Sequence, residues 1–140
     1  MSFARSRCGQ MQQYFVVDDL KYLHRGGRIS GGARLAGSLL QIKPILQGNE
    51  EGEIILNSKF RGKKRALEAL VEKYNELVQD KAAPIGTAHA DAAADALRLQ
   101  TMLRESGATG SVLSVCYEPV TGSHVGPGTV ALFFYGQSWR

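Results

Sequence analysis

The sequence predicts an α/β sandwich in which six strands form one sheet and two long helices cover the same face of it. Two observations carry this prediction: six short runs of strand-forming residues, and two longer segments whose apolar residues recur with helical spacing. A length of 140 residues with 44% hydrophobic residues fits one domain, which can bury its own core without a metal or disulfides.

The first half of the chain supplies three of the strands. Strand-forming residues predict them over 13–17, 43–47 and 53–58, and a turn over 49–52 joins the last two. Asp18 or Asp19 is expected to cap a short helix through residues 20–23. Gly26-Gly27 ends that helix, because glycine accepts the left-handed conformation of a C-cap. A second short helix is predicted over 33–41.

The second half supplies both long helices. Over 62–80, apolar residues from Leu67 to Val78 recur every three or four positions. Over 91–105, Asp91 is the expected N-cap and Gly107 closes the helix. The predicted inner face of this second helix consists of Ala93, Ala96, Leu97 and Leu103. Buried strands are predicted over 83–88, 111–117 and 129–135.

The net charge of +4 is unevenly placed, since residues 1–75 carry 13 Lys and Arg against 7 acids. A basic half suits a nucleic acid, an anionic small ligand or simply a solvated surface. No apolar run is long enough to span a membrane, and residues 1–7 do not form a secretory signal, so we expect a cytoplasmic protein. Cys8 and Cys116 form no disulfide scaffold, and Cys116 is expected to be an inert core thiol.

The first candidate site is the glycine-rich segment 26–32, with Arg28 between its two glycine pairs. Glycines let the backbone approach a ligand closely, and the five fixed donors of an arginine suit a carboxylate or phosphate. The predicted helix that follows would direct its positive end at the same loop. The segment is therefore either an anion site or a plain flexible loop with a surface arginine.

The second candidate site is the predicted loop 119–129, which holds His124 next to Gly126-Pro127-Gly128. A histidine among glycines between two strands is poorly suited to core packing. His124 could donate to an anion or act as a base, or it could be a solvent-exposed loop residue.

Motifs of the common enzyme classes are absent, including H-E-x-x-H, G-x-S-x-G, G-x-G-x-x-G and the Walker A loop. We expect no metal, no cofactor and no catalytic activity. The basic run 59–65 could touch phosphate, but it lacks the stacking aromatics that nucleic-acid surfaces commonly add. A nucleic-acid-binding domain is therefore the least favoured alternative.

Three motifs in register resemble the DegV family of bacterial fatty-acid-binding proteins. They are Leu20-Lys21-Tyr22-Leu23 with Gly26-Gly27-Arg28-Ile29-Ser30, then residues 39–46 (LLQIKPIL), and His124-Val125-Gly126-Pro127-Gly128. The resemblance covers residues 13–136, and residues 1–12 form a weakly matched leader. It implies that residues 13–140 are the carboxy-terminal, acyl-tail domain of the family, a six-stranded mixed sheet with helices on one face.

The resemblance also implies a function. Arg28 and His124 would hold the carboxylate of a long-chain fatty acid, near the backbone of Gly26, Gly27, Gly126 and Gly128. Residues expected to line the acyl tail are Ile29, Leu39, Ile42, Ile45, Leu132 and Phe133. Family members present the bound fatty acid to a fatty acid kinase, which makes an acyl phosphate for phospholipid synthesis, and they are not the catalyst themselves.

The sequence departs from the family pattern because the amino-terminal DegV domain, with its carboxylate-binding Ser and Thr, is not matched. The alternative function is therefore a truncated interaction module without a ligand. Loss of that domain would expose apolar surface around Ile29, Leu35 and Val125, and a homodimer would cover it.

Overall fold

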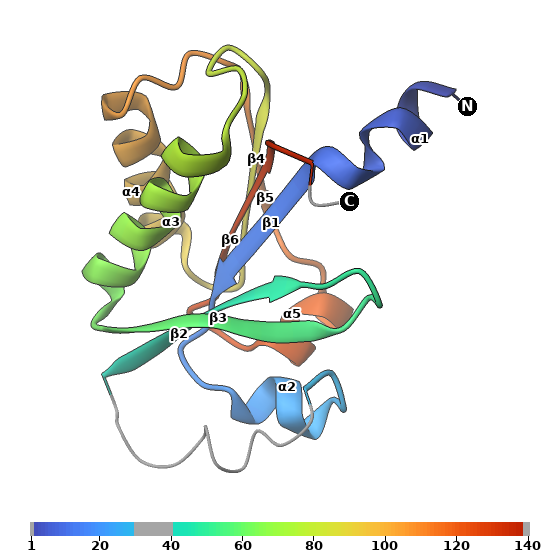
Figure 1. The fold of residues 1–140 in the computed structure, drawn as a ribbon. Helices are drawn as coiled ribbons and strands as arrows, with labels where there is room; N and C mark the ends of the chain where they lie inside the picture. Colours follow the sequence, from blue (N-terminus) through green and yellow to red (C-terminus); the bar gives the residue numbers. More distant parts are fainter. Residues whose placement is uncertain (1, 30–40, 139–140) are drawn as a thin grey trace.

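Strand β1 (Met11–Val16) lies inside a six-stranded sheet. The structure is a computed structural model that describes residues 2–29 and 41–138. The strand order is β3-β2-β1-β6-β4-β5 (Figure 1). The other strands are β2 (Ile42–Gly48), β3 (Ile54–Arg61), β4 (Ile85–His89), β5 (Val112–Cys116) and β6 (Val130–Tyr135). Neighbouring strands run antiparallel except β4 and β5, so the sheet is mixed, as the family resemblance implies.

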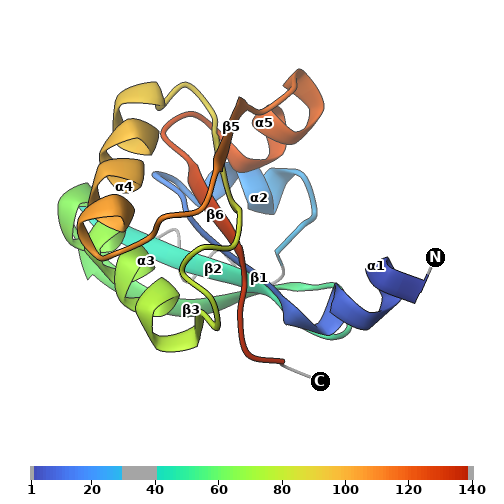
Figure 2. The ribbon, with the colours of Figure 1, turned by 90° about the horizontal axis from the view of Figure 1, so that it is seen from above.

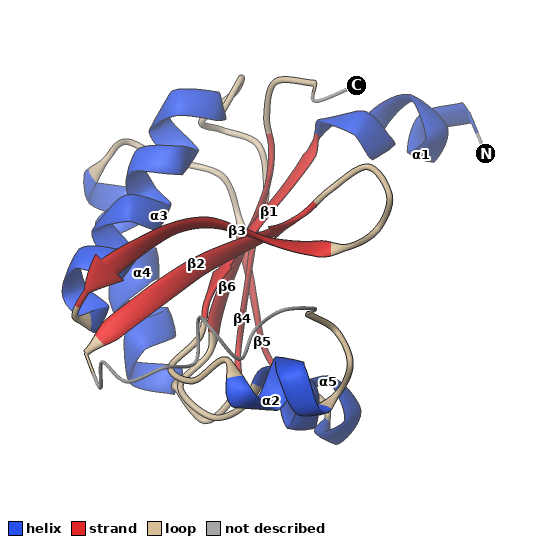
Figure 3. Ribbon diagram, turned by 60° about the horizontal axis from the view of Figure 1, so that its bottom comes forward, coloured by secondary structure: helices blue, strands red, loops and turns tan. Residues whose placement is uncertain are grey.

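The two long helices, α3 (Lys63–Leu77) and α4 (Ala93–Glu105), pack side by side on one face of the sheet (Figures 1 and 2). The short helices are α1 (Ser2–Arg7), the 3-10 turn η1 (Cys8–Gln10), α2 (Lys21–Arg25) and α5 (Pro119–Val125). Helices α2 and α5 lie side by side at one end of the sheet (Figure 3). This end carries both candidate sites.

The main core fills the space between the sheet and the two long helices. Tyr74 and Leu70 of α3 and Leu99 of α4 meet Phe134 and Val16 of the central strands there, and all five are almost completely buried. The Tyr74 and Phe134 rings meet edge to face, with 5.2 Å between their centroids. Helix α3 follows the predicted periodicity because one face of the helix packs against this apolar layer.

A second, smaller core lies under α2 and α5. Its buried residues are Val17, Leu20, Leu23, Ile29, Leu46, Ala90 and Val125. Phe15 and Leu46 face this cluster while the neighbouring Val16 and Ile45 face the main core, because side chains alternate across a sheet. Ile29 and Val125 are 8% and 7% exposed, so the expected exposed apolar face around them is wrong. Leu35 lies outside the described residues.

Helix α4 presents a different face from the predicted one. Asp91 has a positive φ of 46° and is not the N-cap, which is Ala92. Leu97 is 63% exposed and Ala93 is exposed, whereas Leu99 and Ala92 are buried beside Ala96 and Leu103. The segment is rich in alanine, so its two sides differ little in hydrophobicity. Either side could therefore have packed on the core, and the side that does so is rotated from the predicted one.

Two further expectations fail in the last third of the chain. Strand β5 is an edge strand rather than a buried one, and Cys116 is an exposed thiol rather than a core thiol. Segment 119–125 is the helix α5 rather than a loop. The predicted helix over 33–41 has all but its last residue outside the described residues.

Candidate functional site

Helix α2 ends in a tight glycine turn that brings Arg28 back toward the helix. The Gly26 amide donates to the Tyr22 carbonyl at 2.9 Å, and the Arg28 amide donates to the Leu23 carbonyl at 2.9 Å. Gly27 has a φ of 69°, which is the left-handed conformation that the sequence assigned to this C-cap. The turn holds the Arg28 side chain at the surface beside the end of α2.

Helix α5 is short, and its first turn is capped by a side chain. Pro119 occupies its first turn, and the Glu118 carboxylate accepts from the backbone amides of Val120 at 2.6 Å and Thr121 at 2.9 Å. Hydrogen bonds from the Thr121 hydroxyl and then from the Thr121 amide lower the pKa of Glu118. The helix ends at Gly126, whose φ is 82°, and His124 lies in the last turn.

The two segments interlock through their glycines. A Cβ on Gly26 would overlap the imidazole of His124, and a Cβ on Gly126 would overlap the ring of Tyr22. Each segment thus leaves space in its backbone for a side chain of the other. Glycine is required at Gly26 and Gly126 for close approach between these protein segments.

Arg28 and His124 both contact Gly26. The Arg28 guanidinium donates from Nη1 to the Gly26 carbonyl at 2.7 Å, and the His124 ring lies against the Gly26 Cα. His124 Nδ1 lies 2.9 Å from the Val120 carbonyl oxygen. A carbonyl oxygen only accepts, so Nδ1 carries the hydrogen and Nε2 is the ring nitrogen on the Gly26 side. The structure therefore brings together the two candidate site residues that the sequence singled out independently.

A groove of about 570 Å³ opens next to Arg28. Gly27, Arg28 and Ile29 form one wall of this groove, and the segment from Gly52 to Leu56 forms the other. Ile54 and Leu56 pack onto the second core and give the groove apolar surface, while Arg28 and Glu53 add one side chain of each charge to its lining. The sequence missed the β3 residues, although the run of apolar residues over 53–58 was a usable signal.

The other residues expected to line an acyl tail lie elsewhere. Ile45 and Leu132 are fully buried in the main core under α3 and α4. Ile42 and Phe133 are half-buried on their strands, and neither lines the groove. Leu39 lies outside the described residues. Ile29 alone of the described candidates contributes to the groove wall.

The basic run 59–65 is engaged in contacts within the chain. The Arg65 guanidinium pairs with Glu72 at 2.8 Å and lies over the Phe60 ring, 4.9 Å from its centroid. Within residues 2–29 and 41–138, no cluster of three or more His, Cys, Asp or Glu could hold a metal ion. No helix in these same ranges is long and apolar enough to cross a membrane.

Comparisons with known proteins agree with the resemblance. The DegV family model matches residues 4–137. A DegV domain-containing protein of Streptococcus pyogenes is 36% identical over 131 residues, which are 94% of this chain and 45% of that protein. The chain therefore spans about half the length of the curated relatives it matches.

Solved structures show the same fold. A fatty acid binding DegV family protein from Streptococcus agalactiae superimposes with a TM-score of 0.86 and 34% identity, covering 98% of this chain and 48% of that one. The Streptococcus pneumoniae Fatty Acid Kinase (Fak) B3 protein, loaded with linoleic acid, has a TM-score of 0.85 at 17% identity, covering 97% of this chain and 48% of that one.

Proposed function

The chain belongs to the DegV family, and from that premise we propose that it binds a long-chain fatty acid. Arg28 and His124 hold the carboxylate at Gly26, and the acyl chain lies in the groove between Ile29 and β3. The observation that carries the proposal is that Arg28 and His124 both contact Gly26, and that Arg28 also lines a groove together with Ile29 and residues of β3.

The head-group site is built for a carboxylate. The planar guanidinium of Arg28 offers several parallel donors, of which Nη1 already bonds the Gly26 carbonyl. His124 donates from Nε2 only as the imidazolium, because its Nδ1 hydrogen is committed to the Val120 carbonyl. An anion at this point is therefore held by two charge-assisted donors when His124 is protonated.

The groove has room for an acyl tail, and Ile29, Ile54 and Leu56 give it apolar surface. Its volume of about 570 Å³ falls within the range of about 300–1,000 Å³ that is typical of small-molecule sites. Removing an acyl chain from water gains about 0.8 kcal/mol per CH₂, so a sixteen-carbon chain gains on the order of 12 kcal/mol gross. The tail therefore supplies most of the affinity, and Arg28 and His124 orient the head group.

The same site fits a role as carrier for a fatty acid kinase, the role that the family resemblance implies. Arg28 is exposed, so a carboxylate held there stays accessible to a partner enzyme. The kinase would transfer the γ-phosphoryl group of ATP to a carboxylate oxygen, with ADP leaving and an acyl phosphate forming. The chain supplies and orients the substrate for that transfer.

Binding is tested on the delipidated 140-residue protein. The two ligands are palmitate and hexadecanol, because they share a tail and differ in the head group. We expect Arg28→Ala to weaken palmitate binding about ten- to a hundredfold, the effect of losing a charge-assisted hydrogen bond, and to leave hexadecanol binding unchanged. Arg25→Ala, which removes an exposed neighbouring arginine on α2, is the matched control and should change neither affinity. Unchanged palmitate affinity in Arg28→Ala, or no palmitate binding by the wild type, would overturn the proposal.

The kinase step has a separate test. Palmitate-loaded chain is mixed with a fatty acid kinase and ATP, and hydroxylamine traps any acyl phosphate as the hydroxamate. We expect hydroxamate to form faster than with free palmitate at the same total concentration. Equal rates with and without the chain would show that the protein binds fatty acid without presenting it.

A further inference from the structure

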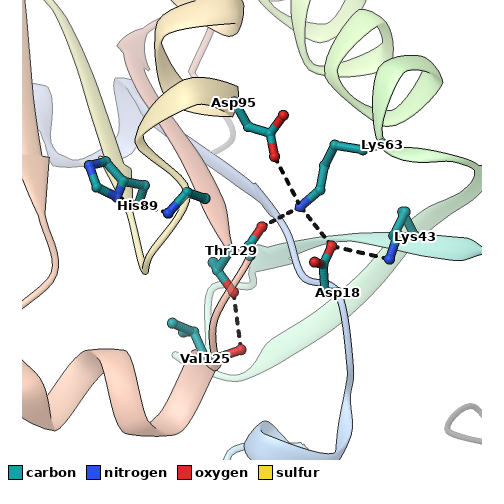
Figure 4. Close-up of polar contacts among 9 residues, drawn as sticks. Asp18, Lys43, Lys63, His89, Asp95, Val125 and Thr129 are labelled. Atoms are coloured by element: carbon teal, nitrogen blue, oxygen red, sulfur yellow. Dashed lines mark hydrogen bonds and ion pairs between the residues drawn. The ribbon is translucent and has the colours of Figure 1, made fainter.

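A half-buried cluster of charges lies beside the candidate site without touching Arg28. The Lys63 ammonium, in the first turn of α3, is 2.7 Å from Asp18 Oδ1 and 4.0 Å from Asp95 Oδ2, and it also donates to the Gly128 carbonyl (Figure 4). Lys43 pairs with the same Asp18 oxygen at 3.2 Å. Three oxygens thus surround one ammonium group, which has three hydrogens to donate. The side chains of Lys63 and Lys43 are only 16% and 15% exposed.

The cluster fixes one turn of the backbone at Gly128. Gly128 has a φ of 88°, and a Cβ at this position would overlap the carboxylate of Asp18. Its amide donates to the Ala90 carbonyl at 2.8 Å, while its carbonyl accepts from Lys63. The turn after α5 is therefore held from both sides, by the end of β4 and by the first turn of α3.

The turn at Gly128 also fixes the end of α5. The Thr129 hydroxyl is fully buried and donates to the Val125 carbonyl at 3.0 Å. The Gly126 amide donates to the Gly122 carbonyl at 2.9 Å, and the Tyr22 ring occupies the space above Gly126. His124 lies within this fixed stretch, so its position over Gly26 depends on the turn that Lys63 holds.

We propose that Lys63 is a positioning residue for the head-group site: through Gly128 it sets the end of α5 and thereby the place of His124 relative to Arg28. The inference rests on the proposed function. Glycine adopts positive φ about as readily as negative φ, so the conformations of Gly126 and Gly128 are selected by the contacts around them. The Lys63–Gly128 contact is a side-chain contact that joins this turn to α3.

Methionine at position 63 keeps the length and the apolar stem of the side chain and removes its charge. We expect Lys63→Met to weaken palmitate binding about tenfold and to leave hexadecanol binding unchanged, because only the head-group contact is disturbed. Lys64→Met is the matched control, since Lys64 is the exposed neighbour in the same turn of α3, and it should change neither affinity.

A double-mutant cycle tests whether Lys63 acts through His124. If it does, Lys63→Met adds little to the loss already caused by His124→Gln. Losses that multiply in the double variant would overturn the inference, as would unchanged palmitate affinity in Lys63→Met. Circular dichroism establishes that each variant is folded, and Asp18→Asn, which removes the charge of the shared partner, replaces Lys63→Met if that variant does not fold.

A readout without fatty acid separates this inference from the proposed function. In the ligand-free chain, Lys63→Met should shift the imidazole NMR resonances of His124, and Lys64→Met should not. The His124 resonances could shift in Lys63→Met while the wild type binds no palmitate. That result would support the positioning role of Lys63 and overturn the proposed function. Unshifted His124 resonances would overturn the positioning role whatever the ligand is.

Discussion

The imidazole of His124 lies against the Cα of Gly26, in the space that the Cβ of any other residue would fill. The ring of Tyr22 likewise fills the space that a Cβ on Gly126 would occupy. The segments of α2 and α5 are therefore joined by two contacts, each between the ring of one segment and a glycine of the other. Arg28 bonds to the carbonyl of that same Gly26. The geometry of the proposed head-group site thus depends on a residue that has no side chain.

Gly26→Ala should destabilise the protein by about 1–3 kcal/mol, the usual cost of overpacking. Gly26 has a right-handed backbone, so the cost arises from overlap with His124 and not from strain. Gly122→Ala is the matched control: Gly122 lies inside α5 with open space around its Cα, and alanine there should stabilise by about 0.5–1 kcal/mol. Urea unfolding measures both, and equal midpoints for the two variants would refute the contact.

His124→Gln should weaken palmitate binding by roughly tenfold, the effect of losing one hydrogen bond, because it removes the imidazole that lies against Gly26. Hexadecanol affinity should not change in this variant, because its head group is uncharged. Binding measurements on the delipidated protein check both. An unchanged palmitate affinity in His124→Gln would place His124 outside the proposed head-group site.

Glu118 should make the start of α5 sensitive to acid. Its pKa is lowered in the folded protein, first by the Thr121 hydroxyl and then by the Thr121 amide, so the stability it contributes is present above the ordinary pKa of a glutamate and is lost as the pH falls through the folded value. Below about pH 4, the protection of amides 120–125 against hydrogen exchange, measured relative to their intrinsic exchange rate at each pH, should fall in the wild type. Glu118→Gln should show low protection at every pH, and a wild type with equally low protection at neutral pH would contradict the cap.

Leu99→Ala should destabilise the protein by about 2–5 kcal/mol, because Leu99 is completely buried in the main core. Leu97→Ala on the same helix should stay within about 0.5 kcal/mol of the wild type, because that side chain is 63% exposed. Thermal or urea unfolding decides between the observed face of α4 and the face that the sequence predicts. Equal effects of the two substitutions would favour neither face.

The sequence predicted those elements whose structure depends on neighbouring residues in the chain. The spacing from Leu67 to Tyr74 predicts α3 because one helix face packs on an apolar layer, and all six strands occur near their predicted positions. Gly26-Gly27 ends α2 as expected because the conformation of a C-cap depends on neighbouring residues. Arg28 and His124 were singled out from residue type and neighbouring glycines, and the structure places both in contact with Gly26, while their contact with a ligand stays a prediction.

Features that depend on strand order or on distant contacts were missed. Val112–Cys116 is as apolar as a central strand, but its place at the sheet edge is fixed by topology, and this leaves Cys116 exposed. The glycines after His124 favoured a loop over 119–129, but the Glu118 carboxylate caps the first turn of a helix over 119–125 and the Tyr22 ring packs on Gly126 at its end. Lys63 showed no sign of its role because its partners, Asp18 and Gly128, are brought to it only by the tertiary fold.

Strands β1 and β6 are paired along their whole length, from Met11 with Tyr135 to Val16 with Val130. Arg28 follows β1 in the chain and His124 precedes β6. The two residues of the proposed site are therefore far apart in the sequence and come together only when the two strands pair. Closing so long a loop carries an entropic cost that grows with its length, and contacts of high contact order form slowly. The proposed site therefore requires β6, and a chain that has not yet formed β6 lacks the site. Once formed, occupancy of the site by the proposed ligand raises the free energy of unfolding of the whole domain through mass action.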